Sequence, residues 1–218
     1  MPLLGDVRET ILALDAAMGD SRADTNPDWH KRIAEVKTDC DATRQTEMAS
    51  TKIPVEPPRV MAEIAKRLGK DDVVVSDASF SAGWISGYLL AQKPGRQFIF
   101  ARGQGGLGYS VPGAIGAAEM MPKGAKVVTL AGDGGFSYTV GELTTQAQYN
   151  QPIINVVINN GKLGWINMWQ KLYFDKTISV DLERQGSVPG YEDEARALGI
   201  NGISVEITDE ISAGLGAD

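Results

Sequence analysis

The sequence predicts an α/β fold in which a doubly wound, mostly parallel sheet carries helices on both faces. Three observations predict it. From Ile53 onward, short apolar runs alternate with longer stretches that have helical periodicity. The apolar runs are continuous, which is typical of parallel strands that are buried on both faces. Glycine and polar residues cluster directly after these runs, where open α/β sheets hold their ligands.

Residues 1–19 are expected to form a helix that belongs to a different domain. Val7 and Ile11 recur at helical spacing, and Asp6 is placed to cap the helix with Glu9 as its capping-box partner. One helix makes no domain by itself. We therefore interpret this segment as the remnant of a preceding domain.

Residues 20–52 are polar and are predicted to be a linker that contains one short helix, from Pro27 to about Thr38. Residues 53–218 are predicted to be the α/β domain. Its expected elements, in chain order, are helix Pro57–Leu68, strand Val73–Val75, helix Ala82–Leu90, strand Phe98–Phe100, helix Val111–Met120, strand Val127–Leu130, helix Val140–Tyr149, strand Ile153–Ile158, a helix near Trp165, and a helix and strand between Ala195 and Ile207. The last residues begin a strand and a helix and then stop, so we expect this domain to be truncated at its C-terminus.

Composition argues against several partners and sites. The chain has 218 residues and a formal net charge of -7, so neither nucleic acid nor an anionic membrane is expected as a partner, because both need a basic face. No apolar run approaches the ~20 residues of a membrane span, and no signal peptide is recognised. The single cysteine, Cys40, fits a reducing compartment, and we expect a cytoplasmic protein. The single histidine, His30, argues against a multi-histidine metal site.

Two strand ends carry side chains that suit a metal ion. Asp133 follows one predicted strand and lies between two glycines, and Asn159 and Asn160 follow the next strand. If the two strands are neighbours, a carboxylate and an amide oxygen face the same point, which suits Mg²⁺ that holds a diphosphate. Each motif alone is also typical of a tight turn. The combination of both motifs, with a strand before each and a helix between them, favours the metal site.

The segment that contains these motifs resembles thiamine-diphosphate-dependent enzymes. The stretch GDGGFSYTVGELTTQAQYNQPIINVVINNGKLG resembles the branch with acetolactate synthase and pyruvate oxidase, and so does GGLGYSVPGAIGAA at residues 105–118. The resemblance covers about residues 53–207 and implies the thiamine-diphosphate-binding fold. The opening segment resembles the end of the central domain of this family.

The resemblance implies a site for thiamine diphosphate and Mg²⁺. Asp133 and Asn160 would bind the metal ion, with the backbone carbonyl of Lys162 as a third protein ligand. Ser79 and Ser81 would donate hydrogen bonds to the diphosphate, and they can also cap the helix that follows. The residues implied to bind the cofactor are Ala78, Ser79, Phe80, Ser81, Gly105, Leu107, Gly132, Gly134, Gly135, Asn160, Lys162, Leu163 and Gly164.

The glycine pattern G-x-G-x-x-G at residues 103–108 has two interpretations. It matches a dinucleotide fingerprint, which would make the chain an NAD-binding Rossmann domain with Asp133 as a tolerable match for the acid that binds ribose. By resemblance, Gly105 and Leu107 instead meet the aminopyrimidine of thiamine, with Leu107 as an apolar prop. A core leucine is the alternative for Leu107. The Asn-Asn motif has no place in the dinucleotide interpretation and favours thiamine diphosphate.

No catalytic residue is expected in this chain. By resemblance, the activating glutamate lies in a separate pyrimidine-binding domain, in the same gene or in a partner chain. The implied enzyme decarboxylates a small 2-oxo acid and joins the product to a second carbonyl compound, and this chain alone is expected to be inactive. Trp165 and Met168 match a region that lines the substrate pocket in relatives, and core or interface side chains fit them equally.

The resemblance also bears on assembly. A homo-oligomer, as a dimer or a tetramer, is expected. FAD is a further candidate cofactor of the full-length protein, where it would bind mainly in the absent central domain. A non-catalytic module, which binds the cofactor or dimerises to stabilise a partner, is the alternative from a different functional class.

Overall fold

The computed structural model describes residues 4–19, 26–95, 97–182, 190–207, 210, 211 and 215. The chain divides into two compact units, Met1–Thr43 and Arg44–Asp218. Linker residues 20–25 and most of the predicted C-terminal helix after Ile207 lie outside the described residues. In the described part, no helix is both long enough and apolar enough to cross a lipid bilayer.

Two helices begin in the first unit. In α1 (Val7–Met18) the Asp6 side chain caps the helix as predicted, because its carboxylate accepts a hydrogen bond from the backbone N of Glu9 at 3.1 Å. Helix α2 (Pro27–Met48) runs well past the predicted end near Thr38. The physical reason is that no glycine or proline interrupts residues 28–48. The predicted domain boundaries stay predictions.

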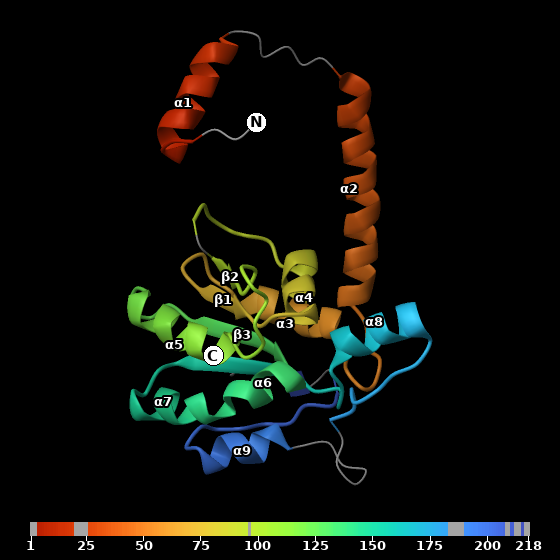
Figure 1. Cartoon of the computed structure of the whole chain (residues 1–218), viewed down its shortest axis with the longest axis vertical. Helices are drawn as coiled ribbons and strands as arrows, with labels where there is room; N and C mark the ends of the chain where they lie inside the picture. The colour runs from red at the N-terminus through yellow and green to blue at the C-terminus, as the bar shows by residue number, and fades with distance from the viewer. Residues whose placement is uncertain are drawn as a thin grey trace. The chain divides into compact units, whose positions relative to one another are not determined.

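Four strands form one parallel sheet within the second unit (Figure 1). The order along the sheet is β2 (Phe98–Phe100), β1 (Val73–Ser76), β3 (Val127–Gly132) and β4 (Ile153–Ile158). In the register, Val73 pairs with Val127, and Val127 pairs with Ile153. The chain passes from β1 to β2 on one side and then to β3 on the other side. The topological switch point therefore lies between β1 and β3, at the position where such sheets hold ligands.

Helices cover both faces of this sheet (Figure 1). On one face, Val74 of β1 and Leu130 of β3 join a buried cluster with Met61 and Ile85, which belong to α3 and α4. Val73 points to the opposite face, because side chains alternate along a strand, and packs there in a cluster with residues of α5. The helices of this unit are α3 (Pro57–Arg67), α4 (Phe80–Tyr88), α5 (Ser110–Met120), α6 (Asp133–Thr139), α7 (Leu143–Gln148), α8 (Gly164–Phe174) and α9 (Tyr191–Ala197). The predicted α/β fold class is confirmed.

Two local predictions need correction. Helix α6, directly after β3, was not predicted, whereas the predicted helix Val140–Tyr149 is present as a 3₁₀ turn (Val140–Glu142) followed by α7. The described residues 198–207 contain no strand. That segment makes a single backbone bond to the domain start, from the N of Val55 to the O of Glu206 at 3.1 Å, which is too little to extend the sheet.

Candidate functional site

The carboxyl ends of β1, β3 and β4 meet at one edge of the sheet. Asp77 directly follows β1, Asp133 directly follows β3, and Asn159 and Asn160 directly follow β4. The strands are parallel neighbours in the order β1-β3-β4. The sheet therefore brings together the two motifs that the sequence predicts to be adjacent.

Asp133 is the centre of this edge. Its side chain is buried, with 2% of the residue exposed. Its Oδ2 accepts hydrogen bonds from the backbone N of Asn160 at 3.1 Å and of Lys162 at 3.2 Å, and its Oδ1 accepts one from the N of Gly134 at 2.7 Å. The three predicted metal ligands therefore lie in one place.

The oxygen atoms at this point suit a hard divalent cation. A carboxylate offers about four acceptor positions, and the three N–H groups leave one on Oδ1 of Asp133 unused. The amide oxygen of Asn160 accepts one bond, from the backbone N of Lys162 at 3.1 Å. Among the described residues, no three His, Cys, Asp or Glu side chains gather in a metal-binding group. One carboxylate with amide and carbonyl oxygens fits Mg²⁺, which usually keeps water and ligand phosphate in its shell.

The loop after β4 is held in place from its far side. The backbone N of Leu163 donates to the O of Val180 at 2.8 Å, and the N of Leu182 donates to the O of Gly161 at 2.7 Å. The Lys162 ammonium pairs with the carboxylate of Asp181. The side chain of Lys162 is thus engaged in this ion pair, and only its backbone is available to the metal site.

Two glycines at the start of α6 are required by their neighbours. A Cβ on Gly134 would overlap the side chain of Leu163, and a Cβ on Gly135 would lie 2.6 Å from Oδ1 of Asp77. Real Cβ atoms essentially never show contacts this short, so a side chain at either position would force Leu163 or Asp77 to shift. The Cβ sides of both glycines are therefore filled by neighbouring side chains of this site.

The loop after β1 has an unusual conformation. Ser79 has φ 75° and ψ -143°, a region of the Ramachandran map that is nearly restricted to glycine. Ser79 occupies the N-cap position of α4, but its side chain makes no capping bond. Its predicted capping role is therefore not realised. Ser81 lies buried in the first turn of α4.

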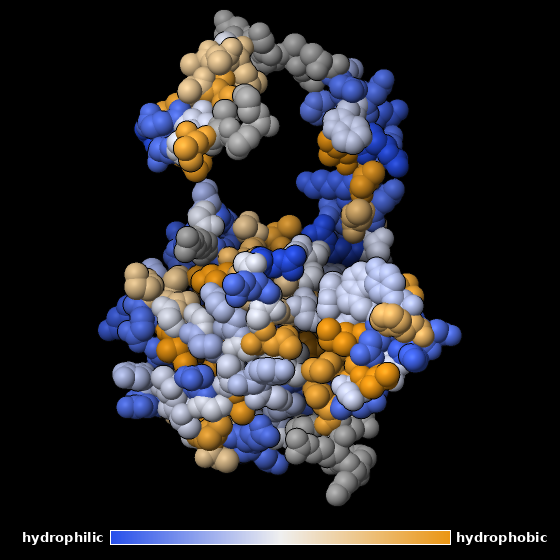
Figure 2. Space-filling model, in the orientation of Figure 1, coloured by the Kyte–Doolittle hydropathy of each residue, from blue (hydrophilic) through white to orange (hydrophobic). Residues whose placement is uncertain are grey.

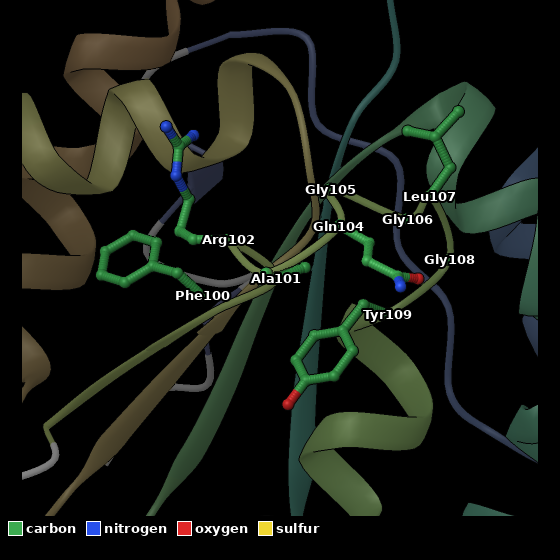
Figure 3. Close-up of a pocket in the computed structure, with 10 residues that line it drawn as sticks. Phe100, Ala101, Arg102, Gln104, Gly105, Gly106, Leu107, Gly108 and Tyr109 are labelled. Carbon is green, nitrogen blue, oxygen red and sulfur yellow. The ribbon is translucent and has the colours of Figure 1, made fainter.

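The glycine turn surrounds a cavity of about 530 Å³ that is lined by the ten residues 100–109 (Figure 3). Gly105 has φ 66° and Gly108 has φ 83°, and both conformations favour glycine. Leu107 is 40% exposed, so it is not a core leucine in this chain. An exposed leucine on this turn fits an apolar contact with a ligand.

Trp165 and Met168 lie on α8. Trp165 is 40% exposed, and Met168 is half-buried. The Trp165 ring packs edge-on against Phe80 with centroids 5.1 Å apart and continues into a row with Trp169. Figure 2 shows hydrophobic residues on the surface around this helix. Trp165 therefore links α8 to the start of α4, directly after the loop that follows β1.

The sequence matches a known protein family over more than half of its length. Residues 77–217 match the family model described as "Thiamine pyrophosphate enzyme, C-terminal TPP binding domain". The chain belongs to the thiamine pyrophosphate enzymes. Thiamine pyrophosphate is thiamine diphosphate, so this membership supports the resemblance and leaves the NAD-binding alternative without support.

Curated relatives of this TPP binding domain carry related names. A probable acetolactate synthase large subunit of Methanococcus aeolicus is 28% identical over 99% of this chain and 37% of its own length. Acetolactate synthase of Mycobacterium leprae is 28% identical, and the large subunit of Corynebacterium glutamicum is 29% identical, each over 97% of this chain and 34% of its own length. The chain thus spans about a third of the length of these relatives.

Two further residues of the TPP binding domain hold the site together, although the sequence analysis assigned neither of them a role at the site. Asp77 binds the glycine turn and the start of α5. The hydroxyl of Tyr191 lies 2.7 Å from Oγ of Ser137 and 3.3 Å from the carbonyl O of Asp133. Burial raises the pKa of the Tyr191 phenol. A carboxylate directly after a buried strand was the available signal for Asp77, whereas no local pattern pointed to Tyr191.

Proposed function

We propose that this chain is the part of an acetolactate-synthase-like enzyme that binds thiamine diphosphate through Mg²⁺. The observation that carries the proposal is the Asp133 carboxylate, which is buried at the end of β3 against the backbone of Asn160 and Lys162. Family membership and the names of the relatives support it. Because the chain spans about a third of those relatives, the activity of the whole protein belongs to the proposal.

In this proposal the metal ion joins the cofactor to the sheet edge. Asp133, the amide oxygen of Asn160 and the carbonyl of Lys162 would hold Mg²⁺. The backbone of Gly134 and Gly135 and the loop at residues 78–81 would contact the diphosphate. Backbone N–H groups suit this task, since they donate to phosphate oxygens without adding net charge.

The remaining residues would orient the cofactor and the substrate. Gly105 would accept a hydrogen bond from the aminopyrimidine through its carbonyl, and Leu107 would support the bent shape of the cofactor. Trp165 and Met168 would line the side from which the substrate enters. Each of these roles is one of binding or orientation, so we assign no catalytic group within this chain.

Thiamine diphosphate, when bound, supplies the carbon nucleophile and the electron sink for decarboxylation of a 2-oxo acid. A pyrimidine-binding domain, in the same gene or in a partner chain, would supply the activating glutamate. The product would then be joined to a second carbonyl compound. Without that domain, this chain would bind the cofactor but would not turn over.

Calorimetric titration of the chain with thiamine diphosphate, with and without Mg²⁺, tests the proposal. We expect binding that requires Mg²⁺ and that weakens at least about tenfold in Asp133→Ala, because one ionic ligand is lost. Asp133→Asn serves as a second variant that keeps an acceptor for the loop. Asp181→Ala is the matched control, since it removes a nearby carboxylate that pairs with the Lys162 side chain.

Three results would contradict the proposal. These are binding that does not need Mg²⁺, an Asp133→Ala variant that is folded by circular dichroism and binds as well as wild type, and binding of NAD in place of thiamine diphosphate. Tryptophan emission gives an independent signal, because Trp165, one of four tryptophans, packs against Phe80 at the start of α4.

We further propose a cytoplasmic homo-oligomer, as a dimer or a tetramer, that acts on a small 2-oxo acid, with FAD as a candidate cofactor of the longer protein. The single free cysteine, Cys40, supports a reducing compartment. Light scattering of the purified protein measures the oligomeric state, and visible absorbance detects bound flavin. A monomer without pyruvate consumption in the presence of its pyrimidine-binding domain would argue against this assignment.

A further inference from the structure

Asp77 lies at the switch point of the sheet, between β1 and β3. Asp77 is 1% exposed, and its backbone N donates to the O of Leu130 in β3 at 2.8 Å. We propose that Asp77 is a positioning residue whose carboxylate fixes the glycine turn against the loop after β1. It thereby sets the spacing between the pyrimidine side and the diphosphate side of the cofactor site. The identity of the ligand in this statement rests on the proposed function.

The Asp77 carboxylate joins segments that are distant in the sequence. Its Oδ1 accepts hydrogen bonds from the backbone N of Ala78 at 2.8 Å and of Gly108 at 3.1 Å. Its Oδ2 accepts one from the backbone N of Ser110 at 3.0 Å. One side chain thus bonds the loop after β1, the end of the glycine turn and the first residue of α5.

The charge of Asp77 is balanced by these N–H groups. Three backbone N–H groups donate to the Asp77 carboxylate, so backbone dipoles stabilise a charge whose burial would otherwise be costly. Ser110 begins α5, an eleven-residue helix whose first N–H groups have no partner within the helix. A carboxylate at this end is favoured by those groups and by the helix dipole. These contacts favour the charged carboxylate at the junction of the glycine turn and α5.

The end of the glycine turn is held from the other side as well. The Oγ1 of Thr139 donates to the O of Gly108 at 3.0 Å, and a Cβ on Gly108 would lie 2.9 Å from side-chain atoms of Tyr138 and Thr139. Gly135 of α6 packs directly on the Asp77 carboxylate. The carboxylate is therefore enclosed between the starts of α5 and α6 and has little freedom to move.

The consequence concerns the residues that precede Gly108. Gly105 and Leu107, which the proposed function places at the aminopyrimidine, sit on the exposed part of the turn (Figure 3). Their position follows that of Gly108, because only two residues separate Gly105 from it. Since the backbone N atoms of Ala78 and Gly108 both donate to Oδ1 of Asp77, this oxygen connects the two sides of the site.

The variant Asp77→Asn tests this role. An amide offers one acceptor oxygen, and its NH₂ group must face either Ser110 or the pair Ala78 and Gly108, where it meets another donor. The matched control is Asp72→Asn. Asp72 is also buried, and its carboxylate also accepts two backbone N–H bonds, from Gly69 and Lys126 at 2.7 Å each, but it precedes β1 at the opposite end of that strand.

Two readouts separate positioning from general stability. Hydrogen exchange of the cofactor-free chain should be faster over residues 103–110 in Asp77→Asn and not in Asp72→Asn. Calorimetry should show that Asp77→Asn weakens thiamine diphosphate by about tenfold, and inorganic pyrophosphate with Mg²⁺ by less than about threefold. The glycine turn meets only the pyrimidine end of thiamine diphosphate, which inorganic pyrophosphate lacks. A general loss of structure would instead weaken the binding of both ligands equally.

The proposal is overturned if exchange over residues 103–110 is the same in both variants, or if the two ligands weaken equally. Should Asp77→Asn not fold, Asp77→Glu takes its place, because it keeps the charge and moves the carboxylate by one methylene. A wild-type chain that binds neither ligand overturns the proposed function. In that case the exchange result still decides whether Asp77 holds the turn.

Discussion

Ser79 holds a backbone conformation that side chains disfavour. Of the described residues with positive φ that are not glycine, it is the one on the candidate diphosphate loop. Such strain costs about 1–3 kcal/mol and persists where the surrounding structure imposes it. The neighbouring bond from the N of Ala78 to the Asp77 carboxylate and the packing of Phe80 on Trp165 fix this loop on both sides of Ser79.

We predict that Ser79→Gly stabilises the chain. Glycine adopts positive φ without strain, and after subtraction of its greater freedom in the unfolded chain the gain is about 1 kcal/mol. For a protein of this size the melting temperature should rise by about 2–4 °C in thermal unfolding. Ser81→Gly is the control, since Ser81 has no positive φ and lies within α4. It should lower the melting temperature. A Ser79→Gly variant that melts at or below the wild-type temperature would refute the strain.

At the scale of residues, the sequence predicts which residues lie close together at the ends of neighbouring strands. Asp133 and Asn160 were predicted to lie together because motifs after adjacent parallel strands must meet, and Lys162 was added by the family resemblance. The backbone N atoms of Asn160 and Lys162 lie within hydrogen-bond distance of the Asp133 carboxylate. The bonds of Asp77 could not be predicted, since they depend on where the backbone of Gly108 and Ser110 passes. That path is set by the tertiary structure and not by any local pattern.

Helix α3 has a buried carboxylate that pairs with cations of its own helix. Glu63 is buried and lies 2.7 Å from Nζ of Lys66, 3.1 Å from a guanidinium N of Arg67 and 3.0 Å from one of Arg59. The hydrogen bond from Lys66, followed by that from Arg67, lowers the pKa of Glu63 despite its burial. These pairs cover the outer side of the helix that packs Met61 and Ile64 into the core.

We predict that Glu63→Gln lowers the melting temperature in a pH-dependent way. The pKa of Glu63 in the folded chain lies below its ordinary value of 4.5. The stabilisation by the carboxylate is therefore fully present above pH 4.5 and is lost as the pH falls through the folded pKa. Thermal unfolding from about pH 7 to about pH 3 should show the difference between wild type and variant shrinking.

The control for this prediction is Glu35→Gln. Glu35 pairs with Arg32 at 3.5 Å in an exposed position on α2, and exposed pairs contribute little. Its effect on melting should be small at every pH. A difference between wild type and Glu63→Gln that stays constant, or that grows as the pH falls, would show that the charge of Glu63 is not the cause.

At the scale of elements, continuous apolar runs predicted all four strands, and β2 and β4 have the predicted bounds. Helix α6 was missed because Gly134 and Gly135 are poor helix formers. Both glycines lie directly against the side chains of Leu163 and Asp77. Tertiary contacts therefore favour a helix that local propensity opposes. The segment before Ile207 is the opposite case. Its composition is typical of a strand, but it makes only one backbone hydrogen bond to the start of the domain, which is too little to form a strand.

At the scale of the molecule, the second unit is closed by contacts of long sequence separation. Tyr191 of α9 packs edge-on against Phe136 of α6 with ring centroids 5.4 Å apart, and its hydroxyl bonds with Ser137. Ser137 in turn donates to the O of Asp133 at 2.8 Å. The C-terminal part of this unit thereby supports the helix that begins with the candidate metal ligand.

We predict that Tyr191→Phe loosens this support without removing the ring packing. Loss of one buried hydrogen bond should cost about 1 kcal/mol and lower the melting temperature by about 2–4 °C. Tyr149→Phe is the control, because Tyr149 is exposed and its replacement should leave the melting temperature unchanged.

Burial raises the pKa of Tyr191, so Tyr191→Phe should also remove an ultraviolet ionisation step that lies above the ordinary tyrosine pKa of 10.0. If the step that the variant removes lies instead at the ordinary tyrosine pKa of 10.0, the Tyr191 hydroxyl is not buried against Ser137, and α9 does not stabilise the site in this way.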